Sequence, residues 1–238
     1  MTALGSGVEE ELEALLARYE LSAQAGERLA ALLAGLTGDT RAPTAIRDPA
    51  DALKAHLADS IVGLELAELR AAGRLADIGA GAGLPGLALA AALEDASVWL
   101  VESQTSKCAF IGALAARAGI SNAQVVCSRV EEWSAGRELH DVVTCRALAP
   151  QPVVLEYAAP LLRPGGRLVE WRGARLADEE ARALVAARAL GLARVEIRRV
   201  EPFAGARDRH LHVFEKVSAT PAGFPRRAGL ARKRPLGA

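Results

Sequence analysis

The segment from residue 75 to residue 86, LADIGAGAGLPG, reads as a buried strand that ends in a glycine loop and opens a helix. The alternating glycines Gly79, Gly81 and Gly83 permit positive φ and leave no side chain between the backbone and a ligand. Pro85 suits the first turn of the following helix, where a missing N–H costs little. This arrangement is typical of nucleotide-type cofactor sites at the carboxyl edge of a parallel sheet.

Short apolar strands alternate with helices from residue 74 onward, which is the pattern of βαβ units in an α/β fold. We expect strands at 74–78, 97–101, 123–127, 140–145, 166–171, 194–200 and 209–217, with helices at 85–93, 106–118, 151–162 and 177–190. The connection 201–208 is too short for a helical crossover, so the last two strands should pair antiparallel. A mostly parallel seven-stranded sheet with a reversed last strand is typical of Rossmann-like class I methyltransferases.

The regions flanking this core differ from it in pattern. Apolar residues at helical spacing predict an N-terminal helical segment, 1–72, that packs on the methyltransferase core, 73–217. The tail, 218–238, has five basic and no acidic residues, so we expect a flexible extension, with affinity for phosphate as the alternative. The remainder of the chain carries 24 basic and 29 acidic side chains.

Composition excludes several classes of protein. The three cysteines are odd in number and lack metal-type spacing, so we expect reduced thiols, no metal site and a cytoplasmic location. No apolar run approaches the ~20 residues of a membrane span, and the N-terminus has no export signal. We expect a monomer. Aromatic residues make up only 4% of the chain, which disfavours a stacking platform for bases.

The glycine motif alone does not identify its cofactor. GxGxxG starting at Gly81, with Glu102 at the end of the next strand, fits a nicotinamide dinucleotide as well as S-adenosylmethionine. Three features favour S-adenosylmethionine: Asp77 just before the first glycine, the compact glycine spacing, and the reversed final hairpin. A carboxylate also suits a cationic sulfonium better than a pyrophosphate. We therefore predict S-adenosylmethionine, with the dinucleotide and a ligand-free turn as alternatives.

Five blocks of sequence carry a family resemblance. They are 44–49 (TAIRDP) together with 56–60 (HLADS), 77–86 (DIGAGAGLPG), 128–132 (SRVEE), 145–147 (CRA) and 209–211 (RHL). In this order they resemble the glucose-inhibited division protein B family, bacterial methyltransferases that modify N7 of a guanine in 16S ribosomal RNA. The chain departs from the family where Cys108 follows Lys107 in place of a basic pair, and where Arg172 replaces a lysine.

The resemblance implies roles for particular residues. Gly79 and Leu84 would contact the donor at the loop, Val130 and Glu131 would flank its adenine, and Arg146 would face the methyl group. Glu102 lies where a ribose-binding acid belongs, and Asp77, Gly81 and Gly83 complete the predicted donor site. Lys107, Arg129, Arg172 and Arg209 are the candidate RNA contacts, and Arg146 and Arg209 the candidate catalytic residues. The implied substrate is 16S ribosomal RNA, or the small ribosomal subunit that contains it.

Methyl transfer to guanine N7 needs no general base, because this nitrogen has an in-plane lone pair and no proton. The enzyme must align the reacting atoms and exclude water, and a carboxylate near the cationic product would help. Simpler interpretations remain: Arg146 as a strand-end ion pair, Glu131 and Glu132 as solvated helix-start acids, and His56 as a hydrogen-bonded packing residue. A methyltransferase acting on a small molecule or protein, or a non-catalytic RNA-binding assembly factor, is the alternative function.

Overall fold

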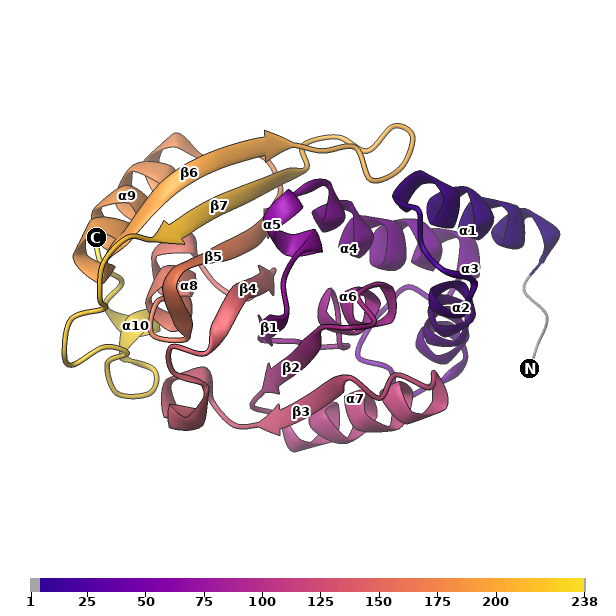
Figure 1. Ribbon diagram of the computed structural model, residues 1–238, viewed down its shortest axis with the longest axis horizontal. Helices are drawn as coiled ribbons and strands as arrows, with labels where there is room; N and C mark the ends of the chain where they lie inside the picture. Colours follow the sequence, from indigo (N-terminus) through magenta and orange to yellow (C-terminus); the bar gives the residue numbers. More distant parts are fainter. Residues whose placement is uncertain (1–4, 238) are drawn as a thin grey trace.

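Seven strands form one sheet in the computed structural model, which describes residues 5–237 (Figure 1). They are β1 (Arg74–Ile78), β2 (Ser97–Glu102), β3 (Ala123–Cys127), β4 (His140–Arg146), β5 (Leu162–Arg172), β6 (Leu192–Arg199) and β7 (His210–Lys216). Their order is β3-β2-β1-β4-β5-β7-β6. The first five are parallel, and β7 runs antiparallel to both β5 and β6. The predicted α/β sheet with a reversed last strand is confirmed.

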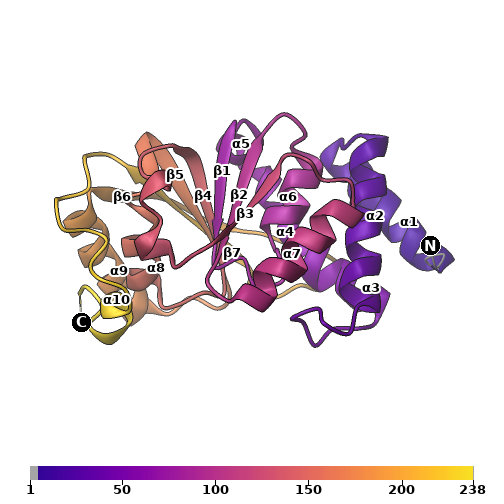
Figure 2. The ribbon, with the colours of Figure 1, turned by 90° about the horizontal axis from the view of Figure 1, so that it is seen from below.

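Helices cover both faces of this sheet (Figure 2). The core helices are α6 (Gly86–Ala92), α7 (Thr105–Arg117), α8 (Gln151–Ala158) and α9 (Ala177–Leu190), with 3-10 turns η3 (Val130–Glu132) and η4 (Ser134–Gly136) between β3 and β4. Because side chains alternate along a strand, Leu75 packs with α6 and α7, whereas Ala76 on the same strand packs with α8 and α9. The chain therefore buries both faces of β1 and exposes only its first residue, Arg74.

Several predicted boundaries move by a few residues. β1 and β3 have the predicted bounds, and α6 begins at Gly86, with Pro85 at its N-cap. β5 begins at Leu162 rather than residue 166, and α8 ends at Ala158. The reason is that Leu162 pairs with His140, with a shift in register before the next pair. Tertiary pairing thus extends this strand beyond its apolar run.

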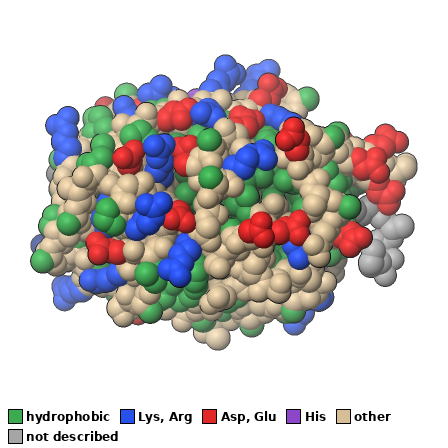
Figure 3. Space-filling view, in the orientation of Figure 1, with side chains coloured by type: hydrophobic (Ala, Val, Ile, Leu, Met, Phe, Trp, Pro, Cys, Tyr) green, Lys and Arg blue, Asp and Glu red, His purple; other side chains and the backbone are tan. Residues whose placement is uncertain are grey.

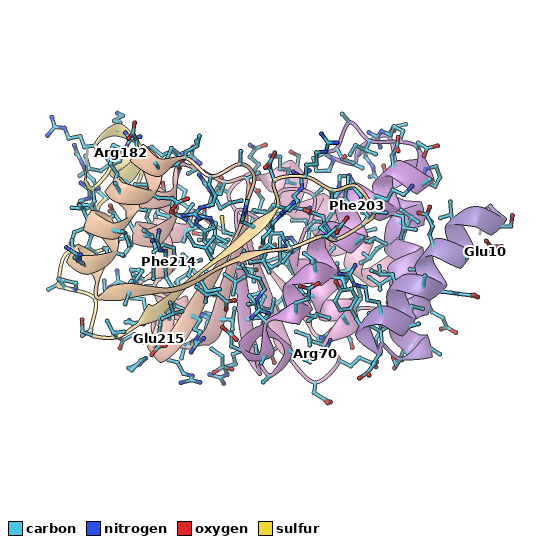
Figure 4. All side chains as sticks on the ribbon, turned by 90° about the horizontal axis from the view of Figure 1, so that it is seen from above. Glu10, Arg70, Arg182, Phe203, Phe214 and Glu215 are labelled. Atoms are coloured by element: carbon cyan, nitrogen blue, oxygen red, sulfur yellow. The ribbon has the colours of Figure 1, made fainter. Side chains whose placement is uncertain are left out.

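The described part of the N-terminal segment begins with α1 (Ser6–Tyr19) and α2 (Ala23–Gly38). Ser22 caps α2 by accepting a hydrogen bond from the Ala25 amide at 3.0 Å. The buried leucines of α2 share one core with Phe110 and Leu114 of α7. Phe203, in the β6–β7 loop, packs against the same core and lies near the N-terminal helices (Figure 4). Residues 1–4 of the predicted segment lie outside the described residues.

The second N-terminal stretch is helical in short, irregular pieces. It consists of α3 (Pro49–Ala52), a π-helical turn η1 (Leu53–Ala58), α4 (Asp59–Ile61), a 3-10 turn η2 (Val62–Glu65) and α5 (Ala67–Arg70). A π turn has no strong sequence signature, and such turns are frequent at functional sites. Here the π turn contains His56 and leads directly into Asp59.

The basic tail differs from the expected flexible extension. Its residues pack against the core, where Arg226 pairs with the buried carboxylate of Glu156, and α10 (Leu230–Lys233) lies beside α8 (Figure 1). Ala238 lies outside the described residues. Figure 3 shows acidic side chains gathered at the end of the molecule near α1, and more lysine and arginine side chains toward the C-terminal half. The basic composition of the tail does not by itself identify Glu156 as the ion-pair partner of Arg226.

Candidate active site

The loop between β1 and α6 depends on glycine at the predicted positions. Gly79, Gly81 and Gly83 have φ values of 69°, 59° and 91°. The amides of Gly79 and Ala80 donate to the Val101 carbonyl at 2.8 and 3.1 Å, which holds the loop against β2. A Cβ on Gly81 would meet nothing closer than the Gly79 carbonyl oxygen at 3.8 Å. The backbone at Gly81 therefore faces open space.

That open space is a cavity of about 460 Å³ at the carboxyl end of β1, β2 and β4. Most of the predicted donor-site and RNA-contact residues line it: Gly79, Gly81, Leu84, Glu102, Lys107, Arg129, Val130, Glu131 and Arg146. The volume lies within the range of ligand pockets for small molecules. The fold thus brings together predicted site residues from five separate segments of the chain.

Asp77 and Gly83 do not line the cavity, contrary to the prediction that both contact the donor. The Asp77 carboxylate is fully buried and accepts hydrogen bonds from the Gly86 amide at 3.0 Å and the Thr144 hydroxyl at 2.9 Å. Burial raises the pKa of Asp77 to about 7. A Cβ on Gly83 would lie 2.7 Å from Leu87. Both residues shape the loop from behind, and neither is available to a ligand in the cavity.

Glu102 lies at the end of β2 with its carboxylate held in a fixed orientation. One oxygen, Oε2, accepts from the Gly81 amide at 3.1 Å, and Oε1 accepts from the amides of Ser103 and Gln104 at 2.7 and 2.9 Å. These three backbone donors tie the acid to the glycine loop. Such an acid, at the rim of the cavity, is placed to accept hydrogen bonds from ribose hydroxyls.

A second cavity, of about 270 Å³, adjoins the first at Arg146 and Ala147. Asp59, Trp171, Arg172, Arg209 and His210 line it together with Val200 and Gly173. Arg146 Nη1 lies 2.8 Å from Asp59 Oδ2, and Arg209 Nε lies 3.4 Å from Asp59 Oδ1. The structure therefore brings both predicted catalytic arginines to a single carboxylate.

Asp59 was not among the predicted site residues, although it belongs to the HLADS block that carried the family resemblance. His56, from the same block, lines the first cavity, and its Nε2 lies 2.8 Å from the Thr44 hydroxyl. Burial, together with the charge of Arg146, lowers the pKa of His56, which favours the neutral imidazole. His56 is hydrogen-bonded as predicted, and it also faces the cavity.

The candidate RNA contacts differ in whether their charged groups already form ion pairs within the protein. Arg172 forms ion pairs with Glu170 at 3.1 Å and Glu179 at 2.7 Å, which commits its guanidinium to the protein. Within residues 5–237, Lys107 and Arg129 have no ion-pair partner, and both line the first cavity. Lys107 and Arg129 can therefore contact an anionic partner more readily than Arg172.

The residues present fit S-adenosylmethionine. Its nucleoside part matches the open backbone at Gly81 and the oriented carboxylate of Glu102, and the cavity volume is adequate. Across the described chain, no group of three or more histidine, cysteine or acidic side chains is arranged to hold a metal ion. No helix among residues 5–237 is both long and apolar enough to span a bilayer.

The strand order, the glycine loop after β1 and the acid ending β2 define an S-adenosylmethionine-dependent methyltransferase. A solved S-adenosylmethionine-dependent methyltransferase from Aquifex aeolicus is similar in fold, with a TM-score of 0.55 and 14% identity, covering 72% of this chain and 94% of that one. The chain belongs to the GidB family, described as rRNA small subunit methyltransferase G, which matches residues 24–211. The family resemblance drawn from the five blocks is confirmed.

Curated relatives cover most of both sequences. Ribosomal RNA small subunit methyltransferase G of Syntrophomonas wolfei is 41% identical over 186 residues, which span 77% of this chain and 86% of the relative. The protein of the same name from Rubrobacter xylanophilus is 39% identical over 219 residues, which span 88% and 82%. The segment after residue 211 lies beyond the family match.

Proposed function

We propose that this chain transfers a methyl group from S-adenosylmethionine to N7 of a guanine in 16S ribosomal RNA. The observation that carries the proposal is the junction of two cavities at Arg146, one built on the glycine loop and one lined by arginines. The names of the relatives support ribosomal RNA of the small subunit as the acceptor. We place the reaction in the cytoplasm and expect the enzyme to act as a monomer.

The first cavity provides the donor site. S-adenosylmethionine supplies a methyl group activated on a sulfonium sulfur. Gly79 and Leu84 would hold the donor at the loop, Glu102 would accept from its ribose hydroxyls, and Val130 and Glu131 would lie beside its adenine. Arg146 stands at the boundary between the cavities, where the methyl group must pass.

The second cavity provides the acceptor site. Guanine N7 attacks through its lone pair, so an N–C bond forms, the S–C bond breaks with its electrons retained on sulfur, and no proton leaves N7. The base becomes cationic. Asp59, with a side chain only 11% exposed, supplies a negative charge at this cavity, and within the described chain its Oδ1 accepts no hydrogen bond. Asp59 is therefore the carboxylate that can stabilise the cationic product.

The arginines must bind the base without blocking its reactive atom. An arginine that takes both O6 and N7 of guanine would cover N7. Nη1 of Arg146 donates to Asp59 Oδ2 at 2.8 Å and to the Ala55 carbonyl at 3.4 Å, which restrains this guanidinium, and Nε of Arg209 lies 3.4 Å from Asp59 Oδ1. An arginine at the base would therefore have to use O6 alone or a phosphate. Lys107 and Arg129, which line the first cavity, contact RNA phosphates, whereas Arg172 at the second cavity is committed to Glu170 and Glu179 and contributes less.

The test uses tritiated S-adenosylmethionine and small ribosomal subunits from a strain that lacks this activity. Label in 16S ribosomal RNA, followed by mass mapping to a single 7-methylguanine, is the expected result. Naked 16S RNA and intact subunits are compared to identify the form of the substrate. Label confined to small molecules or proteins would contradict the proposed acceptor, and loss of labelling with Arg146→Ala would tie activity to this site.

A further inference from the structure

The C-terminal segment returns to the candidate active site after β7. It runs past the end of α8 and forms the short helix α10, and one of its side chains, Arg232, lines the first cavity. This contact was not expected from the composition of the tail.

Arg226 anchors the segment to the core. Its Nε lies 2.9 and 3.0 Å from the two carboxylate oxygens of Glu156, and its backbone amide donates to Oε1 at 3.0 Å. Glu156 is only 1% exposed, so without Arg226 it would be a buried carboxylate with no cation beside it. Arg226 also donates to the Arg234 carbonyl at 2.9 Å, which closes residues 226–234 into a compact loop.

Two hydrogen bonds join this loop to the cavity wall. The Gly229 amide donates to Glu131 Oε1 at 2.9 Å, and Arg232 Nη2 donates to the Leu148 carbonyl at 3.0 Å. Leu148 packs directly over the α-carbon of Gly79, where a Cβ would collide with it. The segment therefore contacts the cavity wall at two places: at Leu148, beside the glycine loop, and at Glu131.

Tyr157 completes this part of the wall. It is buried, it lines the cavity beside Arg232, and burial together with the charge of Glu131 raises the pKa of its hydroxyl. Glu131, Tyr157 and Arg232 thus form one polar cluster at this end of the cavity. Only Arg232 of the three comes from the C-terminal segment.

We propose that residues 224–234 are part of the donor-binding site: the docked segment orients Glu131 and closes the adjoining end of the cavity, so that segment docking and donor binding stabilise each other. Such coupling is reciprocal, because a ligand that binds the docked form more tightly shifts the segment toward docking. The inference rests on the donor half of the proposed function and is independent of the acceptor.

Binding of S-adenosylhomocysteine, measured by calorimetry on the full chain, tests the affinity. Arg232→Ala removes an exposed side chain from the cavity wall. The double variant Glu156→Gln with Arg226→Gln releases the anchor without leaving a lone buried charge. We expect each to weaken binding about three- to tenfold, the range for a lost hydrogen bond. Arg227→Ala is the matched control, because this neighbouring arginine is exposed and its side chain forms no hydrogen bond within the described chain.

Limited trypsin digestion tests docking directly, since the segment contains cleavable arginines at 226, 227 and 232. S-adenosylhomocysteine should slow cleavage in the wild-type chain and protect the anchor variant less. Wild-type affinity in both Arg232→Ala and the double variant, with cleavage unaffected by the ligand, would overturn the proposal. A wild-type chain that binds no S-adenosylhomocysteine would overturn the donor assignment itself, whereas binding without RNA methylation would contradict only the acceptor.

Discussion

Arg146 and Asp59, 87 residues apart in the sequence, form an ion pair of 2.8 Å between the two cavities of the candidate active site. Arg146 ends β4, and Asp59 follows the π-helical turn of the N-terminal segment. The pair therefore joins the methyltransferase core to the N-terminal helices at the point where methyl transfer would occur. The N-terminal segment supplies part of the site as well as covering the sheet.

The charge of Asp59 can be tested with a variant of the same shape. Asp59→Asn removes the negative charge beside the cationic product, so we expect methyl transfer to slow by about 10- to 100-fold, the range for a lost charged hydrogen bond. Binding of S-adenosylhomocysteine, measured in parallel, separates an effect on methyl transfer from one on donor binding, because Arg146, the ion-pair partner of Asp59, lines the donor cavity. Asp51→Asn, at an exposed position of α3, is the control. An unchanged rate in Asp59→Asn would rule out this role.

The glycine loop can be tested by comparing two Gly→Ala substitutions. Gly81 has a φ of 59° and faces the cavity, so Gly81→Ala adds both backbone strain of about 1–2 kcal/mol and a methyl group in the donor site. We expect S-adenosylhomocysteine to bind at least about tenfold more weakly.

Gly112 provides the control for this comparison. It lies within α7, where an added Cβ meets nothing within 4 Å. Gly112→Ala should leave ligand binding unchanged and raise the free energy of unfolding by about 0.5–1 kcal/mol. Urea denaturation measures the second effect. Equal ligand affinity in the two variants would show that Gly81 does not face the donor.

The buried carboxyl of Asp77 predicts a pH dependence of stability. Its folded pKa, about 7, exceeds the ordinary value of 3.8 for an aspartate, so the folded state binds this proton more tightly than the unfolded state does. Its contribution to stability is complete below pH 4 and is lost as the pH rises to 7 and above.

Asp77→Asn removes this ionisation. We therefore expect the free energy of unfolding of the wild type, relative to that of Asp77→Asn, to fall by on the order of 3–4 kcal/mol between pH 4 and pH 8. Urea titrations at several pH values provide the measurement. A difference that stays constant over this range would mean that Asp77 remains in one protonation state.

If the candidate residues contact RNA phosphates, replacing them should change the salt dependence of RNA binding. Arg129→Ala and Lys107→Ala should each weaken binding of 16S ribosomal RNA and reduce the slope of log K against log salt by about 0.7–0.9, the change for one lost phosphate contact. Affinity for S-adenosylhomocysteine is measured alongside, because both residues also line the donor cavity. Arg182→Ala, on the exposed side of α9 (Figure 4), serves as the control. An unchanged slope in both test variants would remove these residues from the RNA interface.

Local sequence pattern was sufficient for most of the fold. The strand, glycine loop and helix from residue 74 to residue 92 follow from apolar runs and from glycine's access to positive φ, both of which act over a few residues. The short connection after β6 likewise required the reversed final strand. Residues at the carboxyl ends of parallel strands meet at one edge of the sheet, so the location of the site also followed from the sequence.

Other features depend on contacts between distant segments, and only the tertiary structure decided them. An aspartate just before a glycine loop is of a residue type that can contact a ligand. Asp77 is instead buried behind the loop, where its carboxylate accepts hydrogen bonds from the Gly86 amide and the Thr144 hydroxyl. The sequence predicts that Arg226 belongs to a solvated basic tail. In the folded protein it lies beside the buried carboxylate of Glu156. A charged side chain's role depends on whether water or another charge surrounds it, and for Asp59, Asp77 and Arg226 that environment is created by packing rather than by neighbouring residues in the sequence.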